Sequence, residues 1–126
     1  MTTQIEPVNH VELYEWLKSL SVYKQELKLF RERLSEVVIK NSGADIFKDI
    51  EHFQNLLIIH QNHIDLIRHD VKQFENKLEL DADVMNDGSN ASLIFEEAQL
   101  RERLKTFEHL FIDFKYEYYA FIRKYI

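Results

Sequence analysis

The chain contains no cysteine among its 126 residues. This absence excludes disulfide bonds, thiol nucleophiles and thiolate metal sites together, and it fits a reducing compartment. Breakers of regular structure are almost as scarce, because the chain has one proline and two glycines. Two glycines cannot build a glycine-rich phosphate loop. So few breakers favour long, uninterrupted helices instead.

Long hydrophobic runs are also missing, although 45% of the residues are hydrophobic. A membrane-spanning helix needs about 20 consecutive apolar residues, and the apolar runs in this chain are far shorter. The opening stretch, MTTQIEPVNH, lacks the basic start and apolar segment of a signal peptide. We therefore expect a cytoplasmic protein that does not enter a membrane.

An excess of positive charge is absent as well, since the formal net charge is -6. Nucleic acids attract basic patches, so the composition argues against a nucleic-acid partner. The acidic excess lies in residues 44–87, which contain ten Asp and Glu against four Lys and Arg. A solvated face that aids solubility is the favoured interpretation, and a docking face for a basic partner is the alternative.

The few breakers that are present divide the chain into three parts. Pro7 precedes the first periodic segment, Gly43 lies in KNSGAD and Gly88 lies in MNDGSNAS. Their placement predicts helices at about 9–41, 44–80 and 90–126. The first junction is short, so the first two helices should be antiparallel neighbours. The second junction, residues 81–92, is longer and polar.

Each predicted helix carries apolar side chains at the a and d positions of a seven-residue repeat. These residues are Leu13, Trp16, Leu20, Tyr23, Leu27, Phe30, Leu34 and Val37 in the first helix, Ile50, Phe53, Leu57, His60, Ile64, Ile67, Val71, Phe74 and Leu78 in the second, and Leu100, Leu104, Phe107, Phe111, Phe114, Tyr118, Phe121 and Tyr125 in the third. The pattern predicts one all-α domain over residues 1–126. We expect an elongated up-down-up antiparallel three-helix bundle with coiled-coil-like heptad packing and left-handed supercoiling.

A second set of apolar residues lies away from the a and d positions. Its members are Val22, Leu29, Ile59, Leu66, Ile112, Tyr116 and Tyr119. Either the core is wider than the a/d seam, or these residues form an exposed patch that docks a protein partner or a second copy. The outward angle of Val22 and Ile59 favours association, for which a homodimer is the simplest form. Tyrosine is common at interfaces, so Tyr116 and Tyr119 suit a contact surface.

Catalytic motifs are not recognisable in the sequence. The patterns H-E-x-x-H and G-x-S-x-G do not occur, and the few serines lie near predicted helix ends without a matching histidine and acid. Carboxylate pairs fall on predicted solvent faces, where their proton affinity should be ordinary. We therefore expect no enzyme activity, no catalytic residue and no cofactor.

Histidines gather in the stretch IHQNHIDLIRHD of the second predicted helix. At about 100° per residue, only His60 and His63 point to one side of that helix. Glu26 and Glu108 flank this level when the helix midpoints are aligned. Two histidines alone make a weak metal site. The sequence therefore leaves His60 and His63 as weak metal candidates and predicts no firm metal site.

His60 occupies a d position, which predicts a polar side chain in the core beside Leu27, Phe30, Phe107 and Phe111. A single polar core residue can set register at some cost in stability. Burial disfavours the charged imidazolium, so the pKa of His60 should be lowered. A structural role is favoured over a pH-sensing or partner-contact role.

These observations favour a non-catalytic, cytoplasmic helical-bundle protein that acts in protein–protein interaction or scaffolding through self-association. The alternative is a helical bundle that binds a metal or small ligand with His60 and His63. A weaker alternative is a regulatory or chaperone-like subunit whose acidic second helix binds a basic partner.

Overall fold

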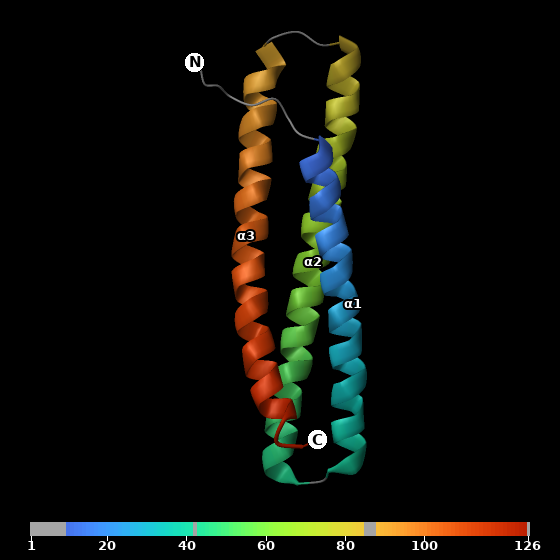
Figure 1. Ribbon diagram of the computed structural model, residues 1–126, viewed down its shortest axis with the longest axis vertical. Helices are drawn as coiled ribbons and strands as arrows, with labels where there is room; N and C mark the ends of the chain where they lie inside the picture. Colours follow the sequence, from blue (N-terminus) through green and yellow to red (C-terminus); the bar gives the residue numbers. More distant parts are fainter. Residues whose placement is uncertain (1–9, 42, 85–87, 126) are drawn as a thin grey trace.

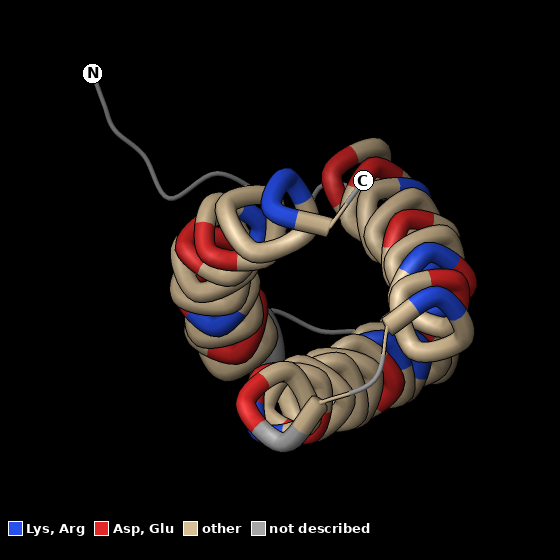
Figure 2. The backbone as a smooth tube through the Cα atoms, turned by 90° about the horizontal axis from the view of Figure 1, so that it is seen from below, with Lys and Arg blue, Asp and Glu red and all other residues tan. Residues whose placement is uncertain are grey.

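The computed structural model describes residues 10–41, 43–84 and 88–125, and within these ranges it contains three α-helices and no strand. Helix α1 runs His10–Lys40, α2 runs Ala44–Val84 and α3 runs Gly88–Ile122. Successive helices reverse direction and lie along one long axis (Figure 1). Seen from the end, they surround a common axis (Figure 2). The predicted all-α three-helix bundle is confirmed, whereas left-handed supercoiling stays a prediction.

The core follows the predicted seven-residue repeats. Every predicted a and d side chain is buried except Tyr23 and Tyr125, which are partly buried against the core. Ile46, Leu93 and Ile122 extend the same buried cluster towards the two ends. Burying a large apolar side chain contributes about 1.5–3 kcal/mol, so this continuous seam is the main source of stability.

The ends of the helices differ from the predicted ones around the second junction. Helix α2 continues to Val84 and α3 begins at Gly88, so both helices extend into the stretch predicted as a junction; residues 85–87 lie outside the described residues. The reason is cooperativity, because adding a residue to an existing helix is far easier than starting one. Polar composition alone therefore did not end α2.

The end of α3 was predicted too late. The helix stops at Ile122, and the next residues form a tighter turn. There the N–H of Lys124 donates to the carbonyl of Phe121 at 3.1 Å, and that of Tyr125 to Ile122 at 3.0 Å. Such three-residue hydrogen bonds are frequent at helix C-termini. At the end of α1, the Asn41 side chain donates to the carbonyl of Val37 at 3.0 Å.

The two interfaces that involve α2 differ from the interface between α1 and α3. Helix α2 packs closely on both neighbours, whereas the backbones of α1 and α3 approach each other less closely. Large side chains span the wider interface. The Phe30 ring lies 4.6 Å from the Tyr118 ring, and the Tyr118 hydroxyl donates to the Phe30 carbonyl at 2.7 Å.

None of the three helices, over the residues described, has a stretch apolar enough to span a bilayer.

Candidate functional site

The seven apolar residues predicted away from the core are all exposed, with relative exposures from 45% to 74%. They are Val22, Leu29, Ile59, Leu66, Ile112, Tyr116 and Tyr119. The interpretation that they widen the core is therefore wrong for this set. Their neighbour Leu56 does pack partly against the core. The outer apolar residues thus belong to the surface of the single chain.

These residues lie on two different sides of α3. Tyr119 borders α1, because its ring lies 5.6 Å from the Phe30 ring. Leu66 instead lines a groove between α2 and α3, together with Leu110. We call the side formed by Val22, Leu29, Ile112 and Tyr119 the α1/α3 face, and the groove that contains Leu66 and Leu110 the α2/α3 groove. Tyr116 and Ile59 lie beside the first and the second of these, respectively.

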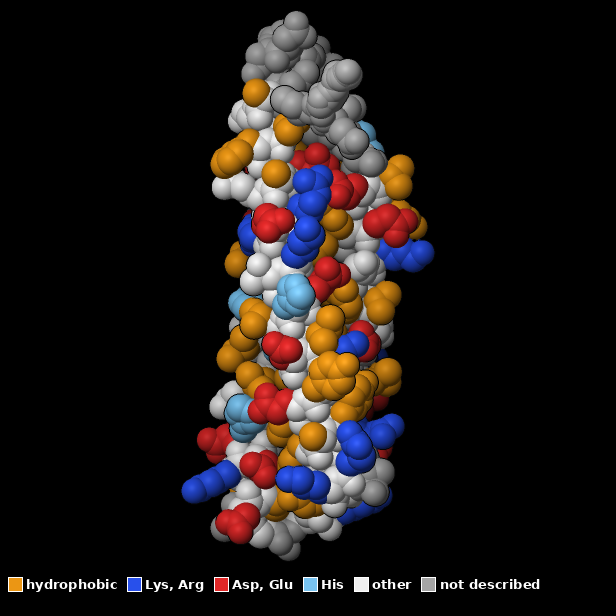
Figure 3. Space-filling view, turned by 60° about the vertical axis from the view of Figure 1, so that its left-hand side comes forward, with side chains coloured by type: hydrophobic (Ala, Val, Ile, Leu, Met, Phe, Trp, Pro, Cys, Tyr) orange, Lys and Arg blue, Asp and Glu red, His pale blue; other side chains and the backbone are white. Residues whose placement is uncertain are grey.

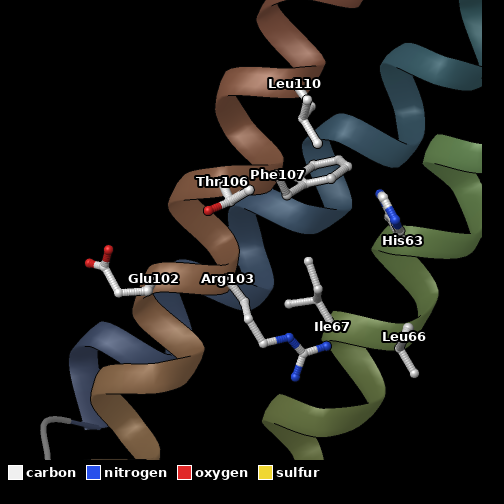
Figure 4. A pocket seen from close by; sticks show the side chains of 8 residues that line it. All are labelled: His63, Leu66, Ile67, Glu102, Arg103, Thr106, Phe107 and Leu110. Carbon is white, nitrogen blue, oxygen red and sulfur yellow. The ribbon is translucent and has the colours of Figure 1, made fainter.

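The α2/α3 groove has a volume of about 380 Å³ and mostly apolar walls. Figure 4 shows His63 on α2 facing Phe107 on α3, and Leu66 and Leu110 also line the groove. Arg103 lies at one end, where its Nη1 is 2.8 Å from the Asp70 carboxylate. The size is within the usual range of about 300–1,000 Å³ for ligand pockets, but the groove is open to solvent.

The groove opens where a series of polar contacts across the α2/α3 interface is interrupted. Two ion pairs lie on one side of it, Lys77 with Glu96 at 3.0 Å and Asp70 with Arg103 at 2.8 Å, and the hydrogen bond between His52 and Glu117, at 2.9 Å, lies on the other. Between them the facing residues are His63 and Leu110, which cannot form an ion pair. A shallow apolar gap remains at that level.

His60 lies in the core at the position that its repeat predicts, with 5% of its surface exposed. Its ring contacts Phe107 at 6.0 Å and Phe111 at 5.7 Å, the predicted neighbours, and Phe114 at 4.7 Å, which was not predicted. Its Nδ1 atom is buried without a hydrogen-bond partner among the described residues. Burial, followed by the charge of nearby His63, lowers the pKa of His60.

His63 is exposed at the edge of the groove, and its ring centre lies 6.5 Å from that of His60. The two glutamates that flank this level are bonded to other residues. Glu26 accepts from the Lys115 ammonium at 3.2 Å, and Glu108 accepts from the Tyr23 hydroxyl. In the described part of the chain, no group of three or more His, Asp or Glu side chains could hold a metal ion.

The other two histidines of α2 lie apart from this pair. His52 Nε2 is 2.9 Å from the Glu117 carboxylate on α3, and His69 Nδ1 is 3.3 Å from the carboxylate of its neighbour Asp70. Asp70 also pairs with Arg103, and Asp65 pairs with Lys24 at 3.0 Å. Part of the acidity of α2 is therefore neutralised within the bundle, which reduces the acidic surface left for a basic partner.

The buried carboxyl group of Glu97 was not predicted from the sequence; it belongs to α3 and lies at the level where α1 begins. Glu97 is only 4% exposed, and it lies one repeat before Leu104, at an a position. Extending the repeat by seven residues would have found it. Beside it, Arg101 holds both carboxylate oxygens of Glu12 at 2.9 and 2.7 Å and lies 5.9 Å from the Trp16 ring. The hydrogen bond from Arg101, aided by one with Glu97, lowers the pKa of Glu12.

Comparison with known proteins adds no assignment. No protein-family model, curated protein sequence or solved structure gives a significant match to this chain.

Proposed function

We propose that the protein is a non-catalytic interaction or scaffold protein that self-associates through its helical surfaces. The carrying observation is that seven large apolar side chains are exposed and that six of them form rows on the two sides of α3. Its cysteine-free sequence suits the reducing cytoplasm, where we place it.

The regular arrangement of these residues supports the proposal. Single exposed apolar residues are normal on any protein surface. Here Val22 and Leu29 follow each other at seven residues on α1, as do Ile59 and Leu66 on α2 and Ile112 and Tyr119 on α3. Seven residues are two turns of helix, so each pair lies in line along one side. Aligned apolar residues with polar surroundings are typical of interaction surfaces.

The test is the mass of the protein in solution. Light scattering behind a size-exclusion column, run from micromolar to millimolar concentration, should give a mass that approaches twice that of the chain. Sedimentation equilibrium on the same samples supplies the dissociation constant. A mass that stays at one chain at the highest concentration contradicts self-association.

A second candidate, ligand or metal binding, is favoured by one observation. The buried Nδ1 of His60 lacks a hydrogen-bond partner among the described residues, and its neighbour His63 opens on the α2/α3 groove. A bound ligand raises stability in proportion to the logarithm of its concentration. Zinc should therefore raise the unfolding temperature of the wild type but not that of His63→Asn. Equal shifts in both proteins would rule out this site.

A further inference from the structure

Resting on the proposed self-association, we propose that a second copy packs in parallel on the α1/α3 face. In this arrangement α1 of one protomer lies against α3 of its partner about a two-fold axis parallel to the helices. Two rows of exposed residues carry the proposal. The α1 row is Glu15, Val22, Leu29 and Glu36, and the α3 row is Lys105, Ile112 and Tyr119.

The register between α1 and α3 follows from ring contacts across the core. Tyr23 contacts both Phe107 and Phe111, at 5.8 and 5.1 Å. The level of Tyr23 therefore lies midway between these two residues of α3. Two helical turns further along α1, Phe30 contacts Phe114 and Tyr118 in the same way, at 6.0 and 4.6 Å.

This register makes the two rows interleave. Val22 precedes Tyr23, so it lies at a level between Lys105 and Ile112. Leu29 precedes Phe30, so it lies at a level between Ile112 and Tyr119. A parallel two-fold axis keeps these levels unchanged between protomers. Each side chain of the partner's α3 row then fits between two side chains of the α1 row, as knobs fit into holes between packed helices.

The charges at the ends of the rows are complementary in this parallel arrangement. Glu15 comes next to the partner's Lys105. Glu36 comes next to the partner's Arg123, which is exposed. Within the described chain, Glu15 and Glu36 have no ion pair, and Lys105 has only a long contact of 3.7 Å with Glu102 on its own helix. These charges are thus available to a partner.

The antiparallel arrangement is disfavoured by the same rows. Turning the partner end for end brings α1 against α1, with Val22 opposite the partner's Leu29. Glu15 then meets the partner's Glu36, while on α3 Lys105 approaches the partner's Arg123. Two opposite-charge contacts would remain, Lys18 with the partner's Glu32, which point further outwards, and Arg33 with the partner's Glu15. Contacts between like charges destabilise the antiparallel dimer, so we expect the parallel dimer to form.

The face is large enough for such a contact. From Glu15 to Glu36 it extends about 32 Å along the helices, and two helices are roughly 20 Å wide. The product is roughly 600 Å² per protomer, the lower end of the range for stable interfaces. Figure 3, which brings α3 forward, shows hydrophobic side chains gathered over the middle and lower part of the visible surface. The Glu26–Lys115 pair at the centre is already satisfied within the chain at 3.2 Å.

The first test exchanges the charges at one end of the rows. In 50 mM salt, Glu15→Lys and Lys105→Glu should each weaken dimerisation about tenfold, because each reverses two symmetry-related contacts. Mixing the two variants should restore dimerisation, since both contacts of the mixed dimer then join opposite charges. Both residues are exposed, so folding should be unaffected. Glu51→Lys on α2 is the control and should leave the dissociation constant unchanged.

The second test reads the orientation directly. The chain has no cysteine, so any disulfide that forms between two single-cysteine variants must join the introduced residues. A mixture of Val22→Cys and Ile112→Cys should form a mixed disulfide dimer under mild oxidation. A mixture of Val22→Cys and Leu29→Cys should not, because those positions meet only in the antiparallel form.

The outcomes separate this inference from the proposed function. A wild-type protein that is monomeric at all concentrations overturns both. A dimer that ignores the charge exchanges, shows no recovery on mixing and forms no Val22–Ile112 disulfide overturns the α1/α3 arrangement alone. Self-association would then have to use another surface, such as the α2/α3 groove.

Discussion

Two neighbouring layers of the core each contain a buried polar side chain, one with a hydrogen-bond partner and one without. In the first layer the Tyr118 hydroxyl donates to the Phe30 carbonyl at 2.7 Å. In the second, His60 Nδ1 has no partner among the described residues. The Phe114 ring contacts both, at 5.8 Å from Tyr118 and 4.7 Å from His60. The same aromatic core thus surrounds a satisfied and an unsatisfied polar group.

The difference has opposite consequences for stability. A satisfied internal hydrogen bond contributes about 1 kcal/mol, whereas a buried unpaired polar group costs about 1–3 kcal/mol. Tyr118 therefore joins α1 to α3 with a net gain, while His60 occupies a core position at a loss. Positions where a sequence departs from the most stable choice are candidates for function. This contrast makes the level of His60 and His63 more informative about function than the level of Tyr118.

The largest effect should come from removing the ring that the two layers share. Phe114→Ala leaves a cavity beside both His60 and Tyr118, and such truncations cost about 3–5 kcal/mol. Urea denaturation should show this loss as a lower midpoint. Tyr116→Ala, two residues away and exposed, is the control and should change stability by less than about 0.5 kcal/mol. A loss below about 1 kcal/mol for Phe114→Ala would contradict the packing described.

Of the two core layers, only the layer that contains His60 should lose stability when the pH is lowered. Because burial lowers the pKa of folded His60, the unfolded chain binds the proton more readily. The stability is complete above the ordinary pKa of about 6.5 and decreases as the pH falls below it. One such proton gives a slope of up to about 1.4 kcal/mol per pH unit. Unfolding free energies measured between pH 7.5 and 5 should show this fall.

The charged neighbours of this layer limit how that slope is interpreted. His63 lies on the same helix, and Tyr23 and Glu108 bond to each other across the α1/α3 interface. Subtracting the profile of His63→Asn from that of the wild type gives the share of His63, and the slope that remains in the variant is the share of His60. If the difference removes the whole slope, the titration belongs to His63 and not to the buried ring.

Replacing His60 by an apolar residue should have a smaller effect of opposite sign. His60→Leu removes the unpaired Nδ1 from the aromatic core, and we expect a gain of about 1–2 kcal/mol at pH 7. The same variant should lose the pH dependence described above. Calorimetry at pH 7 and pH 5 measures both. A loss of stability at pH 7, or an unchanged pH profile, would show that His60 is satisfied in solution.

Much of the fold could be predicted because the seven-residue repeat is a direct consequence of helix geometry. Burial at Leu13, Ile64 or Phe111 follows from that repeat without any knowledge of contacts. Helix ends were harder, because extending a helix by a turn changes the free energy little. Val84 and Gly88 lie in a stretch whose composition suits a helix and a junction equally.

The surface site could be predicted only in part. The repeat placed Val22 and Ile59 outside the core, but it could not say which neighbour each would approach. Such a choice depends on long side chains from two helices, as in the contact of Tyr23 with Glu108. For the same reason the sequence could not show that Glu108, which flanks the level of His63, bonds to Tyr23 instead. Glu97 was within reach of the sequence and was missed because glutamate is seldom fully buried.

The substitution with the smallest expected effect tests the contrast between Tyr118 and His60 most directly. Tyr118→Phe removes only the hydroxyl that donates to Phe30, and we expect a loss of about 1 kcal/mol. The loss stays this low because the Phe30 carbonyl also accepts a backbone hydrogen bond within α1 and is therefore not left without a partner. His60→Leu should raise stability while Tyr118→Phe lowers it, although both make the core more apolar. Chemical denaturation of both single variants and the double variant measures these signs and, through Phe114, any coupling between the layers. If both variants were stabilising, hydrogen bonding would not distinguish the two layers, and apolar packing alone would explain the core.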